Sequence, residues 1–323
     1  VIIVLTVLFI VVDGIRNKPD TSSETSSFIG ESQPASSEPA DISSGSGTVS
    51  QISENSTSGS SSSVTSGVVS GEARDNSFTQ LKAAVQSFAE DFDGRIAVSY
   101  INLANGEIFD LNEKLPFVAA SSIKMSIVTQ LYKRIAEGDL ELTQTLKYDS
   151  RPYPEGDYEF GSGVVYEEPD GTEFSIGRTA QLAITISDNC ATNMIIRKLG
   201  GIDAVAPLLD QISAVVPYRQ QISYKNYKDA FESGKHRTSS KDLATYASYL
   251  YESWRSDKES FDPLMNDLQN TIFDFGVQTL LPEGTKVAHK IGTNNNYRAE
   301  NDVGIVFADE PYVICVMTET EIQ

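Results

Sequence analysis

The spacing of apolar residues changes several times after residue 77, and it predicts both helices and strands. Apolar positions recur every three or four residues in some segments and alternate with polar ones in others. The predicted helices cover 78–92, 121–138, 190–199 and 237–253, and the segment 179–186 is helical or buried. The predicted strands cover 95–103, 106–111, 286–293, 301–308 and 312–319.

The order of these elements predicts the fold class. One helix and two strands come first, a long helical middle follows, and three consecutive strands come last. Strands from both ends of a domain most simply form one antiparallel sheet, with the helical middle packed on one side. We therefore expect an α+β fold of the three-layer α/β sandwich type, with a five-stranded antiparallel sheet.

The first residues differ from this domain. The chain begins with an apolar run of about 12 residues, VIIVLTVLFIVV, whereas a membrane-spanning helix needs roughly 20. Residues 1–18 are expected to be a truncated signal or membrane anchor, with a buried strand as the alternative. No A-x-A cleavage site follows, which favours an uncleaved anchor. The chain is then extracytoplasmic, at the cell surface or secreted, and meets a membrane only through this segment.

Residues 19–76 are rich in serine and nearly free of aromatic residues. Such a segment cannot bury enough apolar surface to offset its ordering entropy, so we expect a disordered linker before a globular domain at 77–323. About 50 flexible residues reach roughly 40 Å, which suits a domain tethered to a membrane. A passive spacer is equally compatible with this composition.

Charge and rare residues exclude several functions. A net charge of -20 and a pI of about 4.4 repel nucleic-acid phosphates, so no nucleic-acid partner is expected. Two cysteines and two histidines provide neither a disulfide framework nor a metal site, and we expect no cofactor. Cys190 and Cys315 are interpreted as small core residues and His289 as a sheet residue. We expect a monomer.

The stretch AASSIKM, residues 119–125, carries the first candidate chemistry. Ser121 has Lys124 three residues later, and residues at this spacing share a helix face. Ser122 is two residues from the lysine and points about 200° around the axis, so the geometry selects Ser121. Lysine can activate a serine when burial or a helix N-terminus lowers its pKa from about 10.4. A serine N-cap followed by a solvent-facing lysine is the alternative.

Two further stretches are TISDNCATN and VAHKIGTNN. The first places Ser187-Asp188-Asn189 between two apolar helical segments, and alone it is typical of a cap at a turn. The second places Lys290 and Gly292 late in an apolar strand, and alone it is typical of a charged strand end.

Together with Ser121 and Lys124, and in this order, these stretches resemble the class A β-lactamase and penicillin-binding serine hydrolase family. That family carries Ser-x-x-Lys, Ser-Asp-Asn and Lys-Thr-Gly. The resemblance covers roughly residues 77–320, and the order of the predicted elements agrees with the family fold. It implies that Ser121 is acylated by a small-molecule β-lactam or a peptidoglycan peptide, that Lys124 is its base and that Ser187 relays a proton to the leaving nitrogen.

The resemblance also implies four binding residues. Asn189 would hydrogen-bond the substrate and help to hold the base, and Lys290 would attract a substrate carboxylate and support the relay serine. Gly292 would leave room for the substrate along the strand. The backbone N–H groups of Thr293 and of the nucleophile would form an oxyanion hole.

Two features depart from the family pattern. Ile291 replaces the threonine of Lys-Thr-Gly, and a hydroxyl donor is lost. The Glu-x-x-Leu-Asn loop that activates the deacylating water should precede the helix at 237–253, but Tyr224 and Lys225 stand at the expected place. Glu232 is the only glutamate nearby, and it lies too close to the helix.

Three interpretations therefore remain open. The first is a class A β-lactamase-like serine hydrolase, and the second is a penicillin-binding, DD-peptidase-like protein that deacylates poorly. The third is a non-catalytic cell-wall binding module on the same fold. The family fold ends with a helix after the last strand, which we expect to be missing because the sequence stops at Gln323.

Overall fold

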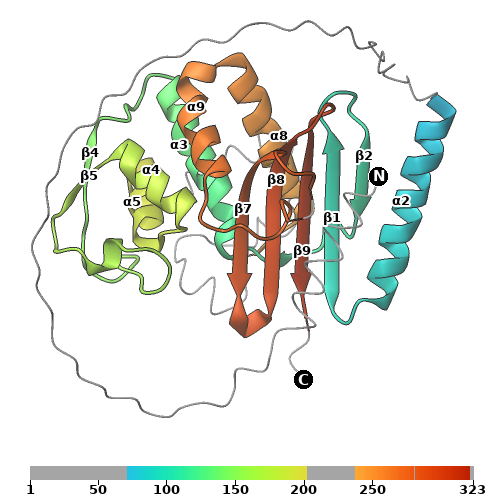
Figure 1. The fold of residues 1–323 in the computed structure, drawn as a ribbon. Coiled ribbons are helices and arrows are strands. Elements are labelled where there is room, and N and C mark those ends of the chain that lie inside the picture. Colours follow the sequence, from blue (N-terminus) through green and yellow to red (C-terminus); the bar gives the residue numbers. More distant parts are fainter. Residues whose placement is uncertain (1–70, 202–236, 280, 321–323) are drawn as a thin grey trace, which may run out of the picture.

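The structure is a computed structural model that describes residues 71–201, 237–279 and 281–320 (Figure 1). The predicted anchor, most of the predicted linker and nearly all of the loop before residue 237 lie outside these residues. Within them, no helix is both long and apolar enough to cross a lipid bilayer.

A five-stranded antiparallel sheet occupies the centre of the molecule (Figure 1). Its strand order, β2-β1-β9-β8-β7, places the N-terminal hairpin beside the last strand, and Val98 pairs with Val316. The predicted α+β fold with one five-stranded antiparallel sheet is confirmed. The strands are β1 Arg95–Asn102, β2 Ile108–Leu111, β7 Lys286–Asn294, β8 Ala299–Phe307 and β9 Tyr312–Glu319.

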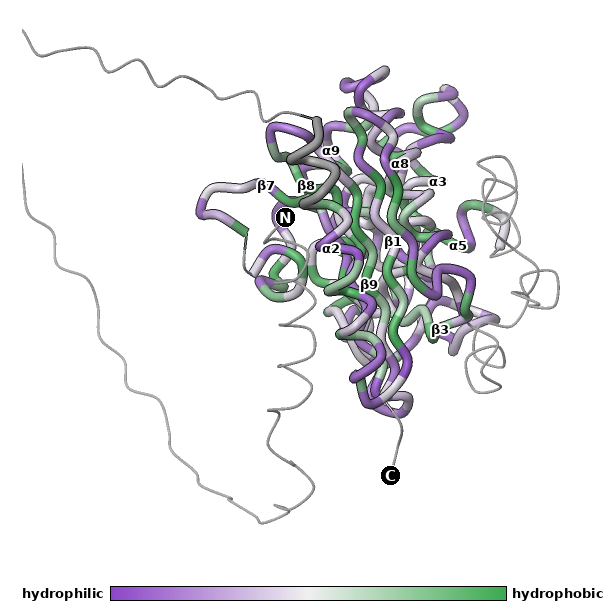
Figure 2. Tube along the Cα trace, turned by 90° about the vertical axis from the view of Figure 1, so that its right-hand side faces the viewer, coloured by the Kyte–Doolittle hydropathy of each residue, from purple (hydrophilic) through white to green (hydrophobic). Residues whose placement is uncertain are grey.

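Helices cover both faces of the sheet, which gives three layers (Figure 2). Helix α2, Gly71–Asp91, lies on one face, and the helical middle region lies on the other. The strands are apolar on both sides because both faces are buried: Cys315 belongs to the core on the helical side, whereas its neighbours Ile314 and Val316 belong to the core under α2. Helix α2 begins before residue 78 and is longer than predicted.

The helical middle packs its apolar faces into the larger of the two cores. Helix α9 is absent from the sequence-based prediction, and Pro263 lies inside it, where proline normally ends a helix. The helices are α3 Lys124–Ala136, α4 Ile176–Thr185, α5 Asn189–Leu199, α8 Ser240–Ser256 and α9 Lys258–Gln269. Two short strand pairs are β3 Phe117–Val118 with β6 Arg237–Thr238, and β4 Thr145–Lys147 with β5 Glu173–Ser175.

The ends of two helices follow from local sequence. Ser239 precedes α8, and its hydroxyl accepts a hydrogen bond from the N–H of Asp242, which caps the helix. Helix α5 ends because Gly200 adopts a φ of 101°, a left-handed value that glycine reaches without a steric penalty.

The rare residues lie in the core, as predicted. Cys190 and Cys315 are both buried and free. His289 in β7 lies beside Asp302 in β8, with 3.0 Å between Nδ1 and Oδ2, and both side chains are buried. His289 therefore acts as a partner within the sheet.

Candidate active site

Ser121 lies in η1, a 3₁₀ turn at Ala120–Ile123 that leads directly into α3. Residues three apart are aligned in such a turn, so Ser121 and Lys124 still lie on one side of the chain. Within the described residues, however, their side chains are not hydrogen-bonded to each other. Ala120 and Ser187 adopt left-handed φ values of 46° and 57°, and such strain is concentrated at functional sites.

The buried side chain of Lys124 connects the nucleophile turn to the turn between α4 and α5. Its Nζ donates to the carbonyl oxygen of Ser187 at 2.6 Å, to Asn189 Oδ1 at 2.7 Å and to Ser187 Oγ at 3.3 Å. Burial lowers the pKa of Lys124 to about 8, against the opposing effect of the negative charges of Glu159 and Asp188. A lysine with such a pKa is neutral in roughly a tenth of the molecules at pH 7, far more than an ordinary lysine, and can then accept a proton.

Asp188 fixes the Ser-Asp-Asn turn, a role that the sequence did not reveal. Its Oδ2 accepts hydrogen bonds from the N–H groups of Val164 at 2.6 Å and Val165 at 2.9 Å, and its Oδ1 accepts one from Ala191 at 2.8 Å. A Cβ on Gly163 would lie 2.2 Å from this carboxylate. The Gly-Ser-Gly sequence at 161–163 was the available signal, because glycine often marks a close approach of two segments.

Strand β7 forms another wall of the site. A Cβ on Gly292 would lie 2.5 Å from the backbone nitrogen of Ser122 and 3.0 Å from that of Ser121, so β7 lies directly against η1. The backbone of η1 needs the space at this glycine, and the predicted room for a substrate along the strand stays a prediction. Thr293 is exposed beside it, and the side chain of Ile291 is buried.

Lys290 brings a second buried amine to the site. Its Nζ donates to the carbonyl oxygen of Ile291 at 3.0 Å and lies 5.4 Å from the centre of the Phe273 ring. In the described ranges it makes no hydrogen bond to Ser187, and neither it nor Lys124 forms an ion pair with a carboxylate. Burial, and then the charge of Lys124, holds the pKa of Lys290 well below its usual value. Two such amines favour an anionic ligand.

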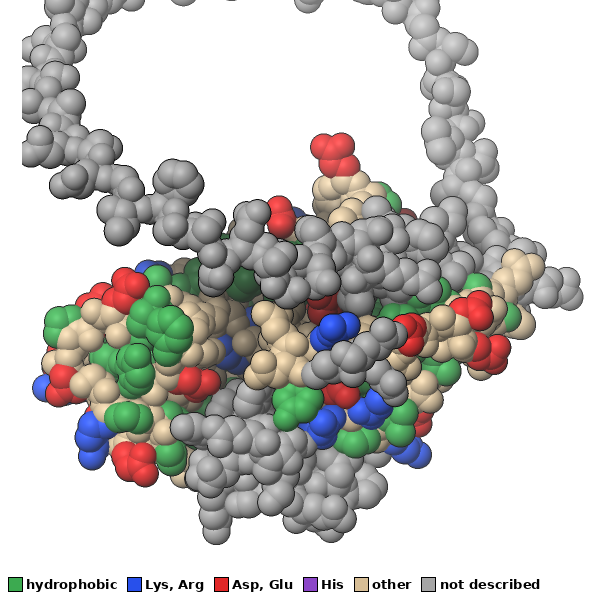
Figure 3. Space-filling model, turned by 90° about the horizontal axis from the view of Figure 1, so that it is seen from below, with side chains coloured by type: hydrophobic (Ala, Val, Ile, Leu, Met, Phe, Trp, Pro, Cys, Tyr) green, Lys and Arg blue, Asp and Glu red, His purple; other side chains and the backbone are tan. Residues whose placement is uncertain are grey.

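The surface near the site is hollowed between the side of α4 and α5 and the side of the sheet, and basic side chains are visible in the hollow (Figure 3). Hydrophobic side chains gather on the α4–α5 side. Phe160 and Val164, which are 73% and 49% exposed, flank the glycine-rich segment that contacts the Ser-Asp-Asn turn. No group of His, Cys, Asp or Glu suited to a metal ion occurs in the described part of the chain.

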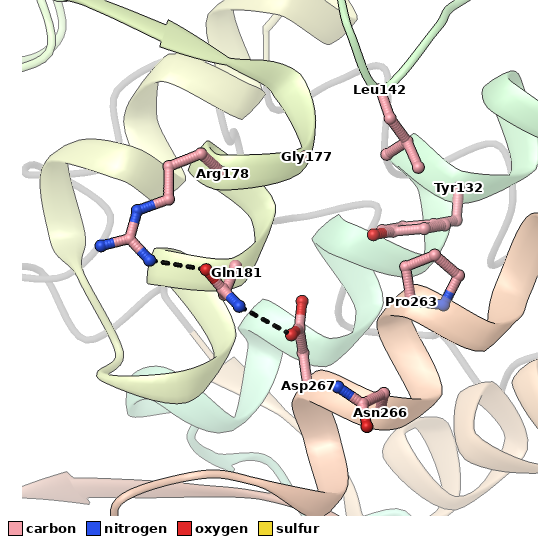
Figure 4. Close-up of a pocket in the computed structure, with 8 residues that line it drawn as sticks. All are labelled: Tyr132, Leu142, Gly177, Arg178, Gln181, Pro263, Asn266 and Asp267. Carbon is pink, nitrogen blue, oxygen red and sulfur yellow. Dashed lines mark hydrogen bonds between the residues drawn. The ribbon is translucent and has the colours of Figure 1, made fainter.

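A separate pocket of about 370 Å³ lies between α3, α4 and α9 (Figure 4). Asp267 and Gln181 face each other across it, with 3.5 Å between Gln181 Nε2 and Asp267 Oδ1. Tyr132 and Pro263 form an apolar wall. No residue of the candidate site lines this pocket, and burial raises the pKa of Asp267 to about 6.

Replacing Asp267 with asparagine is expected to stabilise the protein above pH 6. The folded-state pKa of about 6 exceeds the unfolded value near 3.9, so stability falls as pH rises between these values. Because the pocket admits water, we expect a gain of about 1–2 kcal/mol at pH 7.5, or roughly 2–6 °C in Tm. Thermal melts at pH 7.5 and pH 4 measure it; an equal gain at both values would contradict this origin.

The family model described as the beta-lactamase enzyme family matches residues 80–322. Beta-lactamase SME-1 of Serratia marcescens is 31% identical over 40% of this chain, and the match spans 42% of that protein. An imipenem-hydrolyzing beta-lactamase of Enterobacter cloacae is 26% identical over 72% of this chain and 80% of its own length.

Solved structures have a similar fold. PBP-A is 25% identical, with a TM-score of 0.65, and the match covers 75% of this chain and 88% of PBP-A. A PBP-A mutant with the same scores is an acyl-enzyme complex with penicillin G. The TLA-1 extended-spectrum beta-lactamase has a TM-score of 0.65 at 21% identity, over 76% of this chain and 91% of its own, and supports the fold alone.

Proposed function

Because the chain belongs to the beta-lactamase enzyme family, we propose that Ser121 forms an acyl-enzyme with β-lactams or D-Ala-D-Ala-type peptides. The observation that carries this proposal is the buried Lys124, whose pKa is about 8 and which follows a partly exposed Ser121 by one 3₁₀ turn. Ser122 is a poor candidate because it is buried and its hydroxyl donates to the carbonyl oxygen of Ala119 at 2.6 Å.

Acylation proceeds in three proton transfers, two of which involve Lys124. Neutral Lys124 accepts the proton of Ser121 Oγ, which attacks the carbonyl carbon of the amide. The C–N bond then breaks, and the leaving nitrogen takes a proton from Ser187 Oγ. Lys124 Nζ lies 3.3 Å from this hydroxyl and returns its proton there. Asn189 keeps the lysine oriented during both transfers through its 2.7 Å hydrogen bond.

The tetrahedral oxyanion is stabilised by the backbone N–H groups of Ser121 and Thr293. Gly292 permits this pairing, because it lets β7 approach the backbone of η1. Two preorganised N–H donors contribute several kcal/mol to such a step, about 3 kcal/mol each.

Substrate selection rests on Lys290. β-Lactams and peptides that end in D-alanine both carry a carboxylate, and Lys290 is a buried amine without a carboxylate partner among the described residues, so an anionic ligand favours its protonated form. Ile291 adds no hydroxyl donor, so the carboxylate is bound by charge and by backbone groups.

A second candidate function is a penicillin-binding, DD-peptidase-like protein that acylates and then deacylates slowly. The segment 221–237 supports it, because no glutamate stands where the family places its water-activating residue. The likeness to PBP-A also favours this candidate. The N-terminal apolar run and the serine-rich linker support an extracytoplasmic, membrane-tethered location for either enzyme.

The test is intact-protein mass spectrometry after brief exposure to penicillin G. We expect a drug-mass adduct on the wild type and on Ser122→Ala, and no adduct on Ser121→Ala. Peptide mapping should place the adduct at Ser121. An adduct that survives in Ser121→Ala, or penicillin hydrolysis that does not need Ser121, would overturn the proposal.

A further inference from the structure

We propose that Glu159 is the general base that activates the deacylating water, since no glutamate of the segment 221–237 stands where the family places that residue. This inference rests on the proposed acyl-enzyme at Ser121. It concerns the second half of the reaction, the hydrolysis of the ester.

The contacts of Glu159 place its carboxylate near Asn189 and Lys124. Its Oε2 accepts a hydrogen bond from Asn193 Nδ2 at 3.0 Å. Asn193 lies four residues after Asn189 in α5, so the two residues share one helix face and are separated by about 6 Å along the axis. Asn189 in turn binds Lys124 at 2.7 Å.

The backbone around Glu159 is held against α5 as well. Its N–H donates to Cys190 Sγ at 3.3 Å, and the thiol donates to its carbonyl oxygen at 3.5 Å. Two residues later, a Cβ on Gly161 would lie 3.1 Å from Asn189 Nδ2. The segment 159–161 therefore follows the Ser-Asp-Asn turn closely. The charge of Glu159 is also the largest effect that raises the pKa of Lys124 against burial.

Neighbouring carboxylates are already committed to structural contacts. Asp188 accepts three backbone N–H groups, and Asp157 forms an ion pair with Arg197, with 2.7 Å between Oδ2 and Nη2. Glu155 is exposed on the same loop. Among the described residues, Glu159 makes only the hydrogen bond to Asn193 through its carboxylate, which leaves Oε1 available to a water.

The chemical step balances without any further reactant. Glu159 takes one proton from a water molecule while the water oxygen bonds to the ester carbon. The tetrahedral intermediate then collapses, and the bond from carbon to Ser121 Oγ breaks. Ser121 Oγ receives the proton that Glu159 took, and a carboxylic acid leaves.

The experiment compares Glu159→Gln with the wild type and with Glu155→Gln, which removes an exposed charge from the same loop. Acylation by penicillin G is followed by rapid mixing and quenching. Decay of the adduct is followed by intact-protein mass spectrometry. Glutamine keeps an oxygen that can accept the hydrogen bond of Asn193, so the loop should stay in place. We expect adduct decay to slow by about 10²–10⁴-fold in Glu159→Gln, with acylation within about fivefold of the wild type.

Other outcomes are equally decisive. Decay that is unchanged in Glu159→Gln would overturn the base role, and so would a change confined to the pH dependence of acylation, which would make Glu159 a positioning residue for Lys124. Glu159→Asp should recover part of the decay rate, whereas a purely structural residue would behave alike as Gln and Asp. Failure of the wild type to form any adduct at Ser121 would instead refute the proposed function itself.

Discussion

Replacing Lys124 with methionine is expected to slow acylation of Ser121 by about 10³–10⁴-fold, in the upper range for removal of a general base. Methionine has nearly the same length and suits a buried site, but it cannot accept a proton. The proposed mechanism uses this amine twice, first for Ser121 Oγ and then to resupply Ser187 Oγ at 3.3 Å. The loss should therefore appear in the acylation rate constant.

The pH dependence of acylation provides a second measurement of the same role. Only neutral Lys124 accepts a proton, and its pKa is about 8. Acylation should rise about tenfold per pH unit below pH 8 and level off above it. Lys124→Met should lose this dependence along with the rate.

The matched control is Lys133→Met, nine residues further along α3. Lys133 pairs with Glu137 at the surface, so its loss removes the same charge from the same helix without touching the site. We expect this variant to acylate at the wild-type rate. If Lys124→Met acylated within tenfold of the wild type, another group would have to be the base.

The sequence predicted the elements that have a strong apolar period, and it predicted the sheet from their order. The missed helix α9 contains Pro263, whose local preference opposes a helix, and its formation depends on burial of Leu264 and Leu268 in the core. Local preference alone does not reveal such tertiary stabilisation.

In the candidate site, too, the sequence reveals what is local and misses what depends on tertiary packing. Ser121 and Lys124 are recognised by spacing because both lie in one turn. The acceptors of Lys124 come from Ser187 and Asn189, which only the fold brings to it. Glu159 has no sequence signal of its own, since its position beside the site depends on how its loop packs on α5.

Gly292 shows a further limit of the sequence. In a strand, a glycine indicates a close approach, but the sequence does not say of what. In the structure the approaching group is the backbone of η1, on which the nucleophile lies. The glycine therefore has a role in the geometry of the nucleophile turn, and its role in leaving room for the substrate stays a prediction.

Gly292→Ala is therefore expected to lower acylation by at least 100-fold, about the effect of losing one oxyanion-hole donor. The added Cβ would lie 2.5 Å from the nitrogen of Ser122, 2.8 Å from the oxygen of Ala119 and 3.0 Å from the nitrogen of Ser121. All three are backbone atoms that cannot rotate away, so β7 and η1 must separate. The N–H groups of Ser121 and Thr293 then no longer converge on one oxygen.

The separation of β7 from η1 in Gly292→Ala should also lower the free energy of unfolding by roughly 1–3 kcal/mol, as overpacking does at other sites. Gly177→Ala is the matched control, because a Cβ there would meet Leu142 at 3.5 Å, an ordinary contact. Single-turnover acylation and thermal melts of both variants separate the two effects. A Gly292→Ala variant that melts several degrees lower yet acylates normally would show that the oxyanion does not depend on the contact between β7 and η1.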